Sequence, residues 1–296
     1  MKKVVLTDTF RICLILVIII LLCKDYYRET YKESFTNKKL ALTTCNNNKT
    51  YYQWIPHCIK FWKKLNFDFV VYFFADELPS ELEEYSKHII LWKPPTNLYT
   101  PSVCQVSRLY LPMLHKNYDM VLITDVDLVP LSPFYFSMVD TFSKDKFIAM
   151  RKKEDEYYMP FNVASPEMWN KLTKVNPTKK SINEKLKQIF EKYKTSNDTP
   201  RKVSWGLDQD LLRIYIERLN EDEKQIITNL DSYYILHSNW EFKKAFFKDK
   251  NKKIDPNKIG TLKDNFIFFT RDDERKTINL QKELDYLASL YKISYK

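Results

Sequence analysis

The sequence predicts an α/β protein with a mostly parallel central sheet flanked by helices. From about residue 40 to residue 124, apolar runs alternate with amphipathic stretches, which is typical of βαβ units. The run "FDFVVYFFAD" at residues 67–76 is apolar almost throughout, as in a strand covered on both faces. The chain has 296 residues, 44% of them hydrophobic, which is enough for one large core.

The expected elements follow one another in chain order. "LALTTC" (40–45) is the first strand, and "YYQWIPHCIKFWKKL" (51–65) carries apolar residues at helical spacing. After the strand at 67–76 we expect a polar helix around Glu81–His88, a strand "IILW" (89–92), a helix "SVCQVSRLYLPMLHK" (102–116) and strands "MVLIT" (120–124) and "KFIAM" (146–150). Amphipathic helices complete the series at "INEKLKQIFEKYK" (182–194), "DQDLLRIYIERL" (208–219) and "LQKELDYLASLYKI" (280–293).

The amino terminus predicts a membrane anchor. An uninterrupted apolar stretch from Ile12 to Cys23 follows Lys2, Lys3 and Arg11, whereas the charges just after it nearly cancel. The stretch is short for a span, which needs about 20 residues, and a cleaved signal peptide is the alternative. No small-residue cleavage pattern follows the stretch, so we favour the uncleaved anchor, with the amino end kept in the cytosol by its positive charge.

This orientation predicts a single-pass type II membrane protein whose body lies in the lumen of an ER/Golgi-like compartment. The expected order is a cytosolic tail at 1–9, a signal anchor at 10–23, a stem at 24–38, the main α/β domain at 39–244 and a basic extension with a packing helix at 245–296.

Composition excludes several classes of protein. With only two glycines, Gly206 and Gly260, the chain has no glycine-rich loop for phosphates or dinucleotides. The formal net charge is +10. A basic cluster suits phosphates, a membrane surface or simply solvent, and consists of Lys243, Lys244, Lys248, Lys250, Lys252, Lys253 and Lys258. No RNA-binding or zinc-finger pattern accompanies this charge, so we expect no nucleic-acid partner. The cysteines outside the anchor, Cys45, Cys58 and Cys104, allow one disulfide and one free thiol.

Three polar clusters stand out against the apolar background. They are Asp125 and Asp127 directly after a strand, Asp208, Gln209 and Asp210 at a helix start, and His237 after an apolar run. Each has an ordinary structural explanation, namely a turn, helix capping and a packed histidine. Together, two carboxylates and an imidazole make a ligand set for Mn²⁺ or Mg²⁺. Such a cation neutralises a diphosphate and makes it a better leaving group.

These motifs resemble those of nucleotide-sugar glycosyltransferases with the GT-A fold, and are most similar to the glycogenin and bacterial galactosyltransferase group. The resemblance covers roughly residues 42–244 and four segments in order. They are "SRLYLPMLHKNYDMVLITDVDLVPLSP", "YMPFNVASPEMWNKL", "WGLDQDLL" and "HSNWEFK". The resemblance implies a GT-A domain, a nucleotide-sugar donor such as a UDP-sugar, and a glycan or glycoprotein acceptor.

The resemblance also implies a metal site. Asp125 would contact the metal and the ribose of the nucleotide, while Asp127 and His237 would complete the coordination of Mn²⁺ (or Mg²⁺). Lys243 would contact the phosphates.

Further roles follow from the same resemblance. Arg108 would contact the phosphates or the sugar, and Asn162 and Asp208 would hold sugar hydroxyls. Gln209 would face the anomeric carbon, and Asp210 would orient the site or the acceptor. The group implies retention of the anomeric configuration, although GT-A enzymes include inverting ones, in which Asp208 or Asp210 would be the general base.

Two other functions fit parts of the sequence. A HAD-type phosphatase also has Asp-x-Asp after an apolar strand, which Asp125 and Asp127 satisfy, but it leaves "WGLDQD" and His237 without a role. A non-catalytic, membrane-tethered glycan-binding protein could use the same fold, because a fold alone does not guarantee activity.

Overall fold

The computed structural model describes residues 38–130, 136, 138–150, 152–153, 156–226 and 267–268. The predicted anchor, nearly all of the stem and the helix expected at 280–293 lie outside these residues. Among the residues described, no helix is long and apolar enough to cross a membrane. The anchor and the orientation in the membrane therefore stay predictions.

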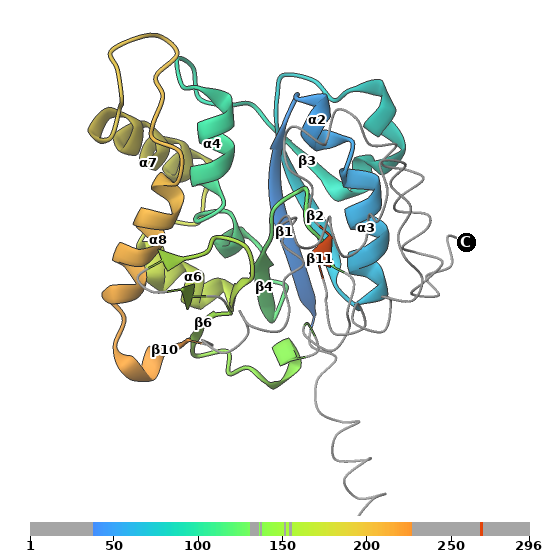
Figure 1. Ribbon diagram of the computed structural model, residues 1–296, viewed down its shortest axis with the longest axis vertical. Coiled ribbons are helices and arrows are strands. Elements are labelled where there is room, and N and C mark those ends of the chain that lie inside the picture. Colours follow the sequence, from blue (N-terminus) through green and yellow to red (C-terminus); the bar gives the residue numbers. More distant parts are fainter. Residues whose placement is uncertain are drawn as a thin grey trace, which may run out of the picture. The chain divides into compact units, whose positions relative to one another are not determined.

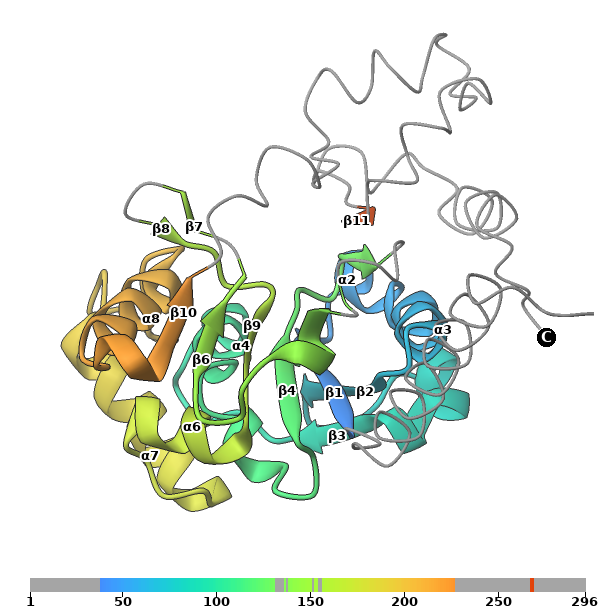
Figure 2. The ribbon, with the colours of Figure 1, turned by 90° about the horizontal axis from the view of Figure 1, so that it is seen from below.

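Seven strands in the described part of the chain form one sheet in the order β10-β6-β9-β4-β1-β2-β3. Four of its six pairings are parallel, and β9 runs antiparallel to both of its neighbours. Figure 2 shows β10, β6 and β9 on one side of β4, and β1, β2 and β3 on the other. The predicted α/β fold with a mostly parallel sheet is confirmed. The strands are β1 (Lys39–Asn46), β2 (Asp68–Phe74), β3 (Ile89–Trp92), β4 (Met120–Ile123), β6 (Phe147–Ala149), β9 (Asn162–Ala164) and β10 (Lys224–Ile226).

Two further strand pairs lie outside this sheet. The strand β5 (Val129–Pro130) pairs with β11 (Ile267–Phe268), and β7 (Lys152–Lys153) pairs with β8 (Glu156–Tyr157).

Prolines end two helices earlier than the apolar spacing predicts. The stretch expected as one helix at 51–65 is divided into α2 (Lys49–Tyr52) and α3 (Ile55–Lys64), and Pro56 lies four residues after Tyr52. A proline ring clashes with the carbonyl four residues earlier and has no N–H to donate to it, so α2 cannot continue past Tyr52. The helix expected at 102–116 is α4 (Thr100–Ser107), capped by Arg108, which lies four residues before Pro112.

Three longer helices follow the predicted pattern. They are α6 (Pro166–Thr173), α7 (Lys179–Lys192) and α8 (Leu207–Glu217). The helix expected around Glu81–His88 is a 3₁₀ helix, η1 (Ser80–His88), in which Leu82 is the one buried residue, so few apolar contacts favour a regular α-helix there. Shorter 3₁₀ turns are η2 (Pro112–Leu114), η3 (Met138–Thr141) and η4 (Glu221–Glu223).

The sheet is covered on both faces. Successive side chains of a strand point to opposite faces. In β1, Ala41 accordingly packs in one core layer with α3, whereas Leu40 and Leu42 pack in the other layer with α4, α6, α7 and α8. Figure 1 shows α2 and α3 on one side of β1, and α4, α7 and α8 on the other. Because both faces are buried, the strands carry the continuous apolar runs seen in the sequence.

Candidate functional site

The candidate site lies where the strand order changes direction. From β1 the chain proceeds outward to β2 and β3, and then returns to place β4 on the other side of β1. Open α/β sheets bind ligands at such a point, beyond the carboxyl ends of the strands. A pocket of about 740 Å³ is found there. The residues of the described chain that line it are Thr44, Cys45, Asn46, Asn48, Tyr51, Pro101, Cys104, Gln105, Arg108, Asp125, Val126, Asp127, Met159, Pro160, Trp205, Gly206, Asp208 and Gln209.

The two acids after β4 belong to a tight turn on the wall of this pocket. The Leu128 amide donates to the Asp125 carbonyl at 3.3 Å and closes the turn. The side chain of Asp125 is 31% exposed, whereas Asp127 as a residue is 5% exposed. A buried strand thus ends on two acids because the turn carries them into a pocket rather than into the core.

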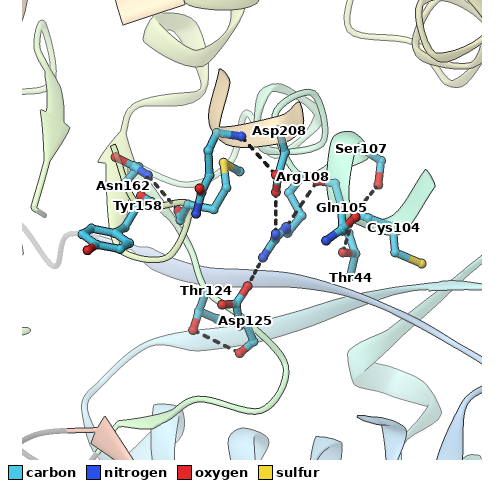
Figure 3. A network of polar contacts seen from close by, with 12 residues as sticks. Thr44, Cys104, Gln105, Ser107, Arg108, Thr124, Asp125, Tyr158, Asn162 and Asp208 are labelled. Carbon is cyan, nitrogen blue, oxygen red and sulfur yellow. Dashed lines mark hydrogen bonds and ion pairs between the residues drawn. The ribbon is translucent and has the colours of Figure 1, made fainter. Parts of the chain in front are cut away.

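Arg108 joins two carboxylates that are far apart in the sequence. It follows α4 directly, and its Nη2 donates to Oδ2 of Asp208 at 2.6 Å. Its Nη1 donates to Oδ1 of Asp125, and its Nε to the carbonyl of Gln105 at 3.3 Å. Figure 3 shows the guanidinium between the two acids. One buried cation therefore joins a carboxylate from the turn after β4 to a carboxylate from the start of α8.

The start of α8 supplies Asp208 and Gln209. Gly206 precedes the helix with φ at +92°, a left-handed conformation that favours glycine. The side chain of Asp208 is 3% exposed and accepts from Arg108 and, at 3.0 Å, from the backbone amide of Gln209. The positive end of the helix dipole favours a carboxylate in this first turn. Asp208 is thus held in a fixed position by hydrogen bonds and by the helix.

The structure brings five of the site residues suggested by the sequence to one pocket. They are Arg108, Asp125, Asp127, Asp208 and Gln209. Their chemical roles stay predictions, because proximity alone does not assign them.

Two other suggested residues lie elsewhere in the described chain. Asp210 is exposed and is not among the residues that line the pocket. Asn162 is fully buried at the start of β9, where its side-chain NH₂ donates to the carbonyls of Tyr158 and Met159 at 2.7 Å each. This contact holds the turn before β9. The contact of Asn162 with a sugar hydroxyl stays a prediction. His237 and Lys243 lie outside the described residues.

Sequence reasoning missed several residues of the pocket. Cys45 and Cys104 line it, and burial raises the pKa of both thiols, so they stay protonated. All three cysteines in the described chain, Cys45, Cys58 and Cys104, are free, which decides against the disulfide that the sequence left open. Trp205 also lines the pocket and is 80% exposed. Its position directly before Gly206, one of the two glycines of the chain, was the sequence signal that could have identified it.

Tyr51 and Tyr52 separate into two environments. Both belong to α2, which follows β1. Tyr51 lines the pocket, whereas Tyr52 is 8% exposed and packs edge-to-face against Phe73 with ring centroids 6.3 Å apart. Tyr52 is therefore a core residue.

The charge of the pocket suits a divalent cation. Its described lining contains the carboxylates of Asp125, Asp127 and Asp208 against the single guanidinium of Arg108, a formal charge of −3 + 1 = −2. Carboxylate oxygens are hard ligands of the kind that Mn²⁺ and Mg²⁺ take. Among the described residues, no group of three or more His, Cys, Asp or Glu side chains is arranged to hold a metal. The third ligand implied by the sequence, His237, lies outside them.

Comparison with known proteins gives structural likenesses at low identity. No protein-family model matches the chain, and no curated protein does. The glycosyltransferase GlyE of Streptococcus pneumoniae TIGR4 is similar, with 16% identity, a TM-score of 0.45, and coverage of 87% of this chain and 64% of that one. A mutant of Drosophila β-1,4-galactosyltransferase 7 in complex with manganese, UDP-Gal and xylobiose has 11% identity, a TM-score of 0.37, and coverage of 83% and 79%. The galactosyltransferase LgtC in complex with donor and acceptor sugar analogs has 11% identity, a TM-score of 0.41, and coverage of 87% and 96%.

All three structures are glycosyltransferases, as is the group that the motifs resemble. The chain spans 64% of the length of GlyE. With TM-scores below 0.5, these likenesses leave the function of the chain to be inferred from the pocket.

Proposed function

We propose that the chain is a metal-dependent glycosyltransferase that moves a sugar from a nucleotide-diphosphate sugar, expected to be a UDP-sugar, to a glycan or glycoprotein acceptor. One observation carries the proposal: Arg108, Asp125 and Asp208 meet in a single pocket beyond the carboxyl ends of β1 and β4. The pocket of about 740 Å³ lies within the range of roughly 300–1,000 Å³ that small-molecule sites occupy.

The charge of the pocket supports metal dependence. A diphosphate is anionic, and a pocket with a formal charge of −2 repels it. A divalent cation would cancel this charge, and Asp125 and Asp127 are the described residues that would hold it, with His237 as the third proposed ligand. When bound, Mn²⁺ or Mg²⁺ would stabilise the departing diphosphate as a Lewis acid.

The environment of Asp208 supports retention of the anomeric configuration. An inverting enzyme needs a carboxylate free to accept a proton from the acceptor hydroxyl. The carboxylate of Asp208 is buried and already accepts from Arg108 and the Gln209 amide, and Asp210 does not line the pocket. Gln209 is the member of this motif with a side chain available to the bound sugar, so we assign it the position facing the anomeric carbon.

Trp205 supports a carbohydrate acceptor. The indole lies at the pocket with 80% of its surface exposed, although burying such a ring stabilises a protein. The C–H groups on one face of a sugar ring can pack against an aromatic ring, which gives this exposure a use. We therefore place the acceptor on the Trp205 side of the pocket.

The proposal also includes the type II orientation, with residues 10–23 as anchor and the body in the lumen. Two exposed asparagines, Asn48 and Asn197, begin the acceptor sequons Asn48-Lys49-Thr50 and Asn197-Asp198-Thr199. A lumenal body would expose both to glycosylation. Loss of a mass shift in Asn48→Gln and Asn197→Gln variants would report it, and an unglycosylated, protease-accessible body in microsomes would contradict this orientation.

The activity is tested with the full chain in detergent. A panel of UDP- and GDP-sugars is screened for Mn²⁺-dependent thermal stabilisation, and the donors that stabilise the protein are assayed for release of the nucleotide diphosphate. We expect release that chelation abolishes, that Mn²⁺ restores, and that Asp127→Asn lowers by at least about 100-fold.

Glu217→Gln, an exposed change on α8, is the matched control and should leave the rate unchanged. Release of phosphate from simple phosphate esters, with no response to any nucleotide sugar, would instead support the phosphatase alternative. Glycan binding without turnover would support the binding-protein alternative.

A further inference from the structure

Cys58 contacts the backbone of the tight turn that carries Asp125 and Asp127. It lies on α3, is 0% exposed, and its Sγ is 3.1 Å from the carbonyl oxygen of Val126 and 3.6 Å from that of Leu128. These two residues flank Asp127 in the sequence. The thiol therefore contacts the backbone immediately before and after a proposed metal ligand.

The Cys58 thiol is a hydrogen-bond donor and not a thiolate. Burial raises its pKa well above the usual value, and the neighbouring carboxylate of Asp127 raises the pKa further. A protonated thiol carries one S–H donor, and the Val126 carbonyl is the nearer acceptor. Cys58 thus acts on the backbone of the turn.

The contact fixes the peptide unit that leads into Asp127. The Val126 carbonyl belongs to the same planar group as the Asp127 amide, so holding this oxygen limits rotation of the plane. Two hydrogen bonds, from the Leu128 amide and the Thr124 hydroxyl to the Asp125 carbonyl, lie within the turn itself. The Cys58 contact instead links its backbone to a helix 68 residues away in the sequence.

The helix that carries Cys58 is a rigid support. Ile55, Phe61 and Trp62 of α3 are at most 1% exposed and belong to the same core layer as Val126 and Leu128. Side chains placed on a packed helix move less than those on a loop. The packing of Val126 and Leu128 in the core therefore fixes the position of the turn, although Asp125 and Asp127 line the pocket.

We infer that Cys58 is a positioning residue for the metal site: its S–H, donated to the Val126 carbonyl, sets the orientation of Asp127. This inference rests on the proposed metal-dependent function. If Cys58 merely filled space, the affinity for Mn²⁺ would not depend on whether the side chain at position 58 can donate a hydrogen bond.

The test measures binding of Mn²⁺ to the full chain in the presence of UDP, by isothermal titration calorimetry. Cys58→Ser and Cys58→Ala differ by one hydroxyl, so the pair isolates the donor from the loss of volume. Partners that orient metal ligands typically change metal affinity about 10- to 100-fold when removed. We expect Cys58→Ala to raise the Kd for Mn²⁺ about tenfold, and Cys58→Ser to stay within about threefold of the wild type.

Two further variants keep the result interpretable. Cys58→Val fills the space of the thiol without a donor, and it should also weaken Mn²⁺ binding while its stability stays closer to that of the wild type. Leu186→Ala truncates a buried residue in the opposite core layer, and it should lower stability without changing the Kd. In donor hydrolysis, the Mn²⁺ concentration for half-maximal rate should rise in Cys58→Ala and Cys58→Val, whereas the rate at saturating Mn²⁺ should approach that of the wild type.

Equal Kd values for the alanine, valine and serine variants would overturn the inference and make Cys58 a space-filling residue. Failure of the wild type itself to bind Mn²⁺ with UDP would instead remove the proposed function, and the inference with it. The two failures are distinguished by the wild-type measurement alone.

Discussion

Replacing Arg108 by methionine should destabilise the protein by leaving a buried charge without its partner. Methionine keeps an unbranched apolar stem and removes the guanidinium. Asp208, whose side chain is 3% exposed, would then keep the Gln209 amide as a donor but lose its compensating charge. Asp125 would lose the same partner, but its side chain is 31% exposed and water can solvate it.

The expected cost comes mainly from Asp208. Removing one partner of a buried ion pair costs about 3–5 kcal/mol, whereas an exposed pair contributes about 0–1 kcal/mol. We therefore expect Arg108→Met to lower the free energy of unfolding by about 3–5 kcal/mol at pH 7. In the double variant Arg108→Met/Asp208→Asn the buried charge is also removed, and most of this loss should be recovered.

The assay is urea unfolding of the wild type, both single variants and the double variant, followed by circular dichroism, which completes a double-mutant cycle. Arg213→Met is the control, because Arg213 lies on the exposed side of α8, 3.9 Å from Glu217, and should change stability by less than about 0.5 kcal/mol. A loss below about 1 kcal/mol in Arg108→Met, or no recovery in the double variant, would refute the view that this cation stabilises a buried acid.

Three further predictions concern residues around the sheet and the pocket. Burial lowers the pKa of His115 from 6.5 to about 4, with the Tyr72 hydroxyl 2.9 Å from its Nε2. Between these values the unfolded chain binds a proton that the folded chain does not, so stability should fall by up to about 3 kcal/mol as the pH drops from 6.5 to 4. Urea unfolding across this window should show a weaker pH dependence in His115→Gln, and an unchanged slope would contradict the assignment. Gly206→Ala should lower the free energy of unfolding by about 1–2 kcal/mol. This loss would come from backbone strain alone, since an added Cβ would lie 3.9 Å from the Gln209 side chain. Wild-type stability in urea would show that the backbone relaxes away from the positive φ. Trp205→Ala should change stability by less than about 0.5 kcal/mol but raise the KM for a saccharide acceptor about three- to tenfold, with donor hydrolysis unchanged, and an unaltered KM would remove the indole from the acceptor site.

The parts of the fold that the sequence predicts are those with a strong local pattern. The run "MVLIT" followed by Asp125 is apolar and then abruptly acidic, so both the strand and its exit into a site could be inferred. Similarly, α8 combines amphipathic spacing with acids in its first turn, and its start was predicted to within one residue.

Other features depend on contacts that no local pattern encodes. The strand β9 has three residues, Asn162–Ala164, and its antiparallel direction is set by its two neighbours in the sheet. Motif resemblance assigns Asn162 to the sugar, and no local pattern predicts that its NH₂ donates to the carbonyls of Tyr158 and Met159. From the sequence, Cys58 is one of the apolar residues at helical spacing in residues 51–65. Its contact with Val126 forms only when α3 packs against the turn after β4.

The contacts of Arg108 also bear on the order in which the protein folds. Its pair with Asp125 closes a loop of 17 residues, whereas its pair with Asp208 closes one of 100. The entropy of loop closure makes the longer connection about 1.6 kcal/mol more costly before other contacts form. A nascent chain can therefore engage this arginine with the nearer acid first. The pocket becomes complete only when α8 packs against the sheet. The site can therefore bind its ligand only after this late, long-range step of folding.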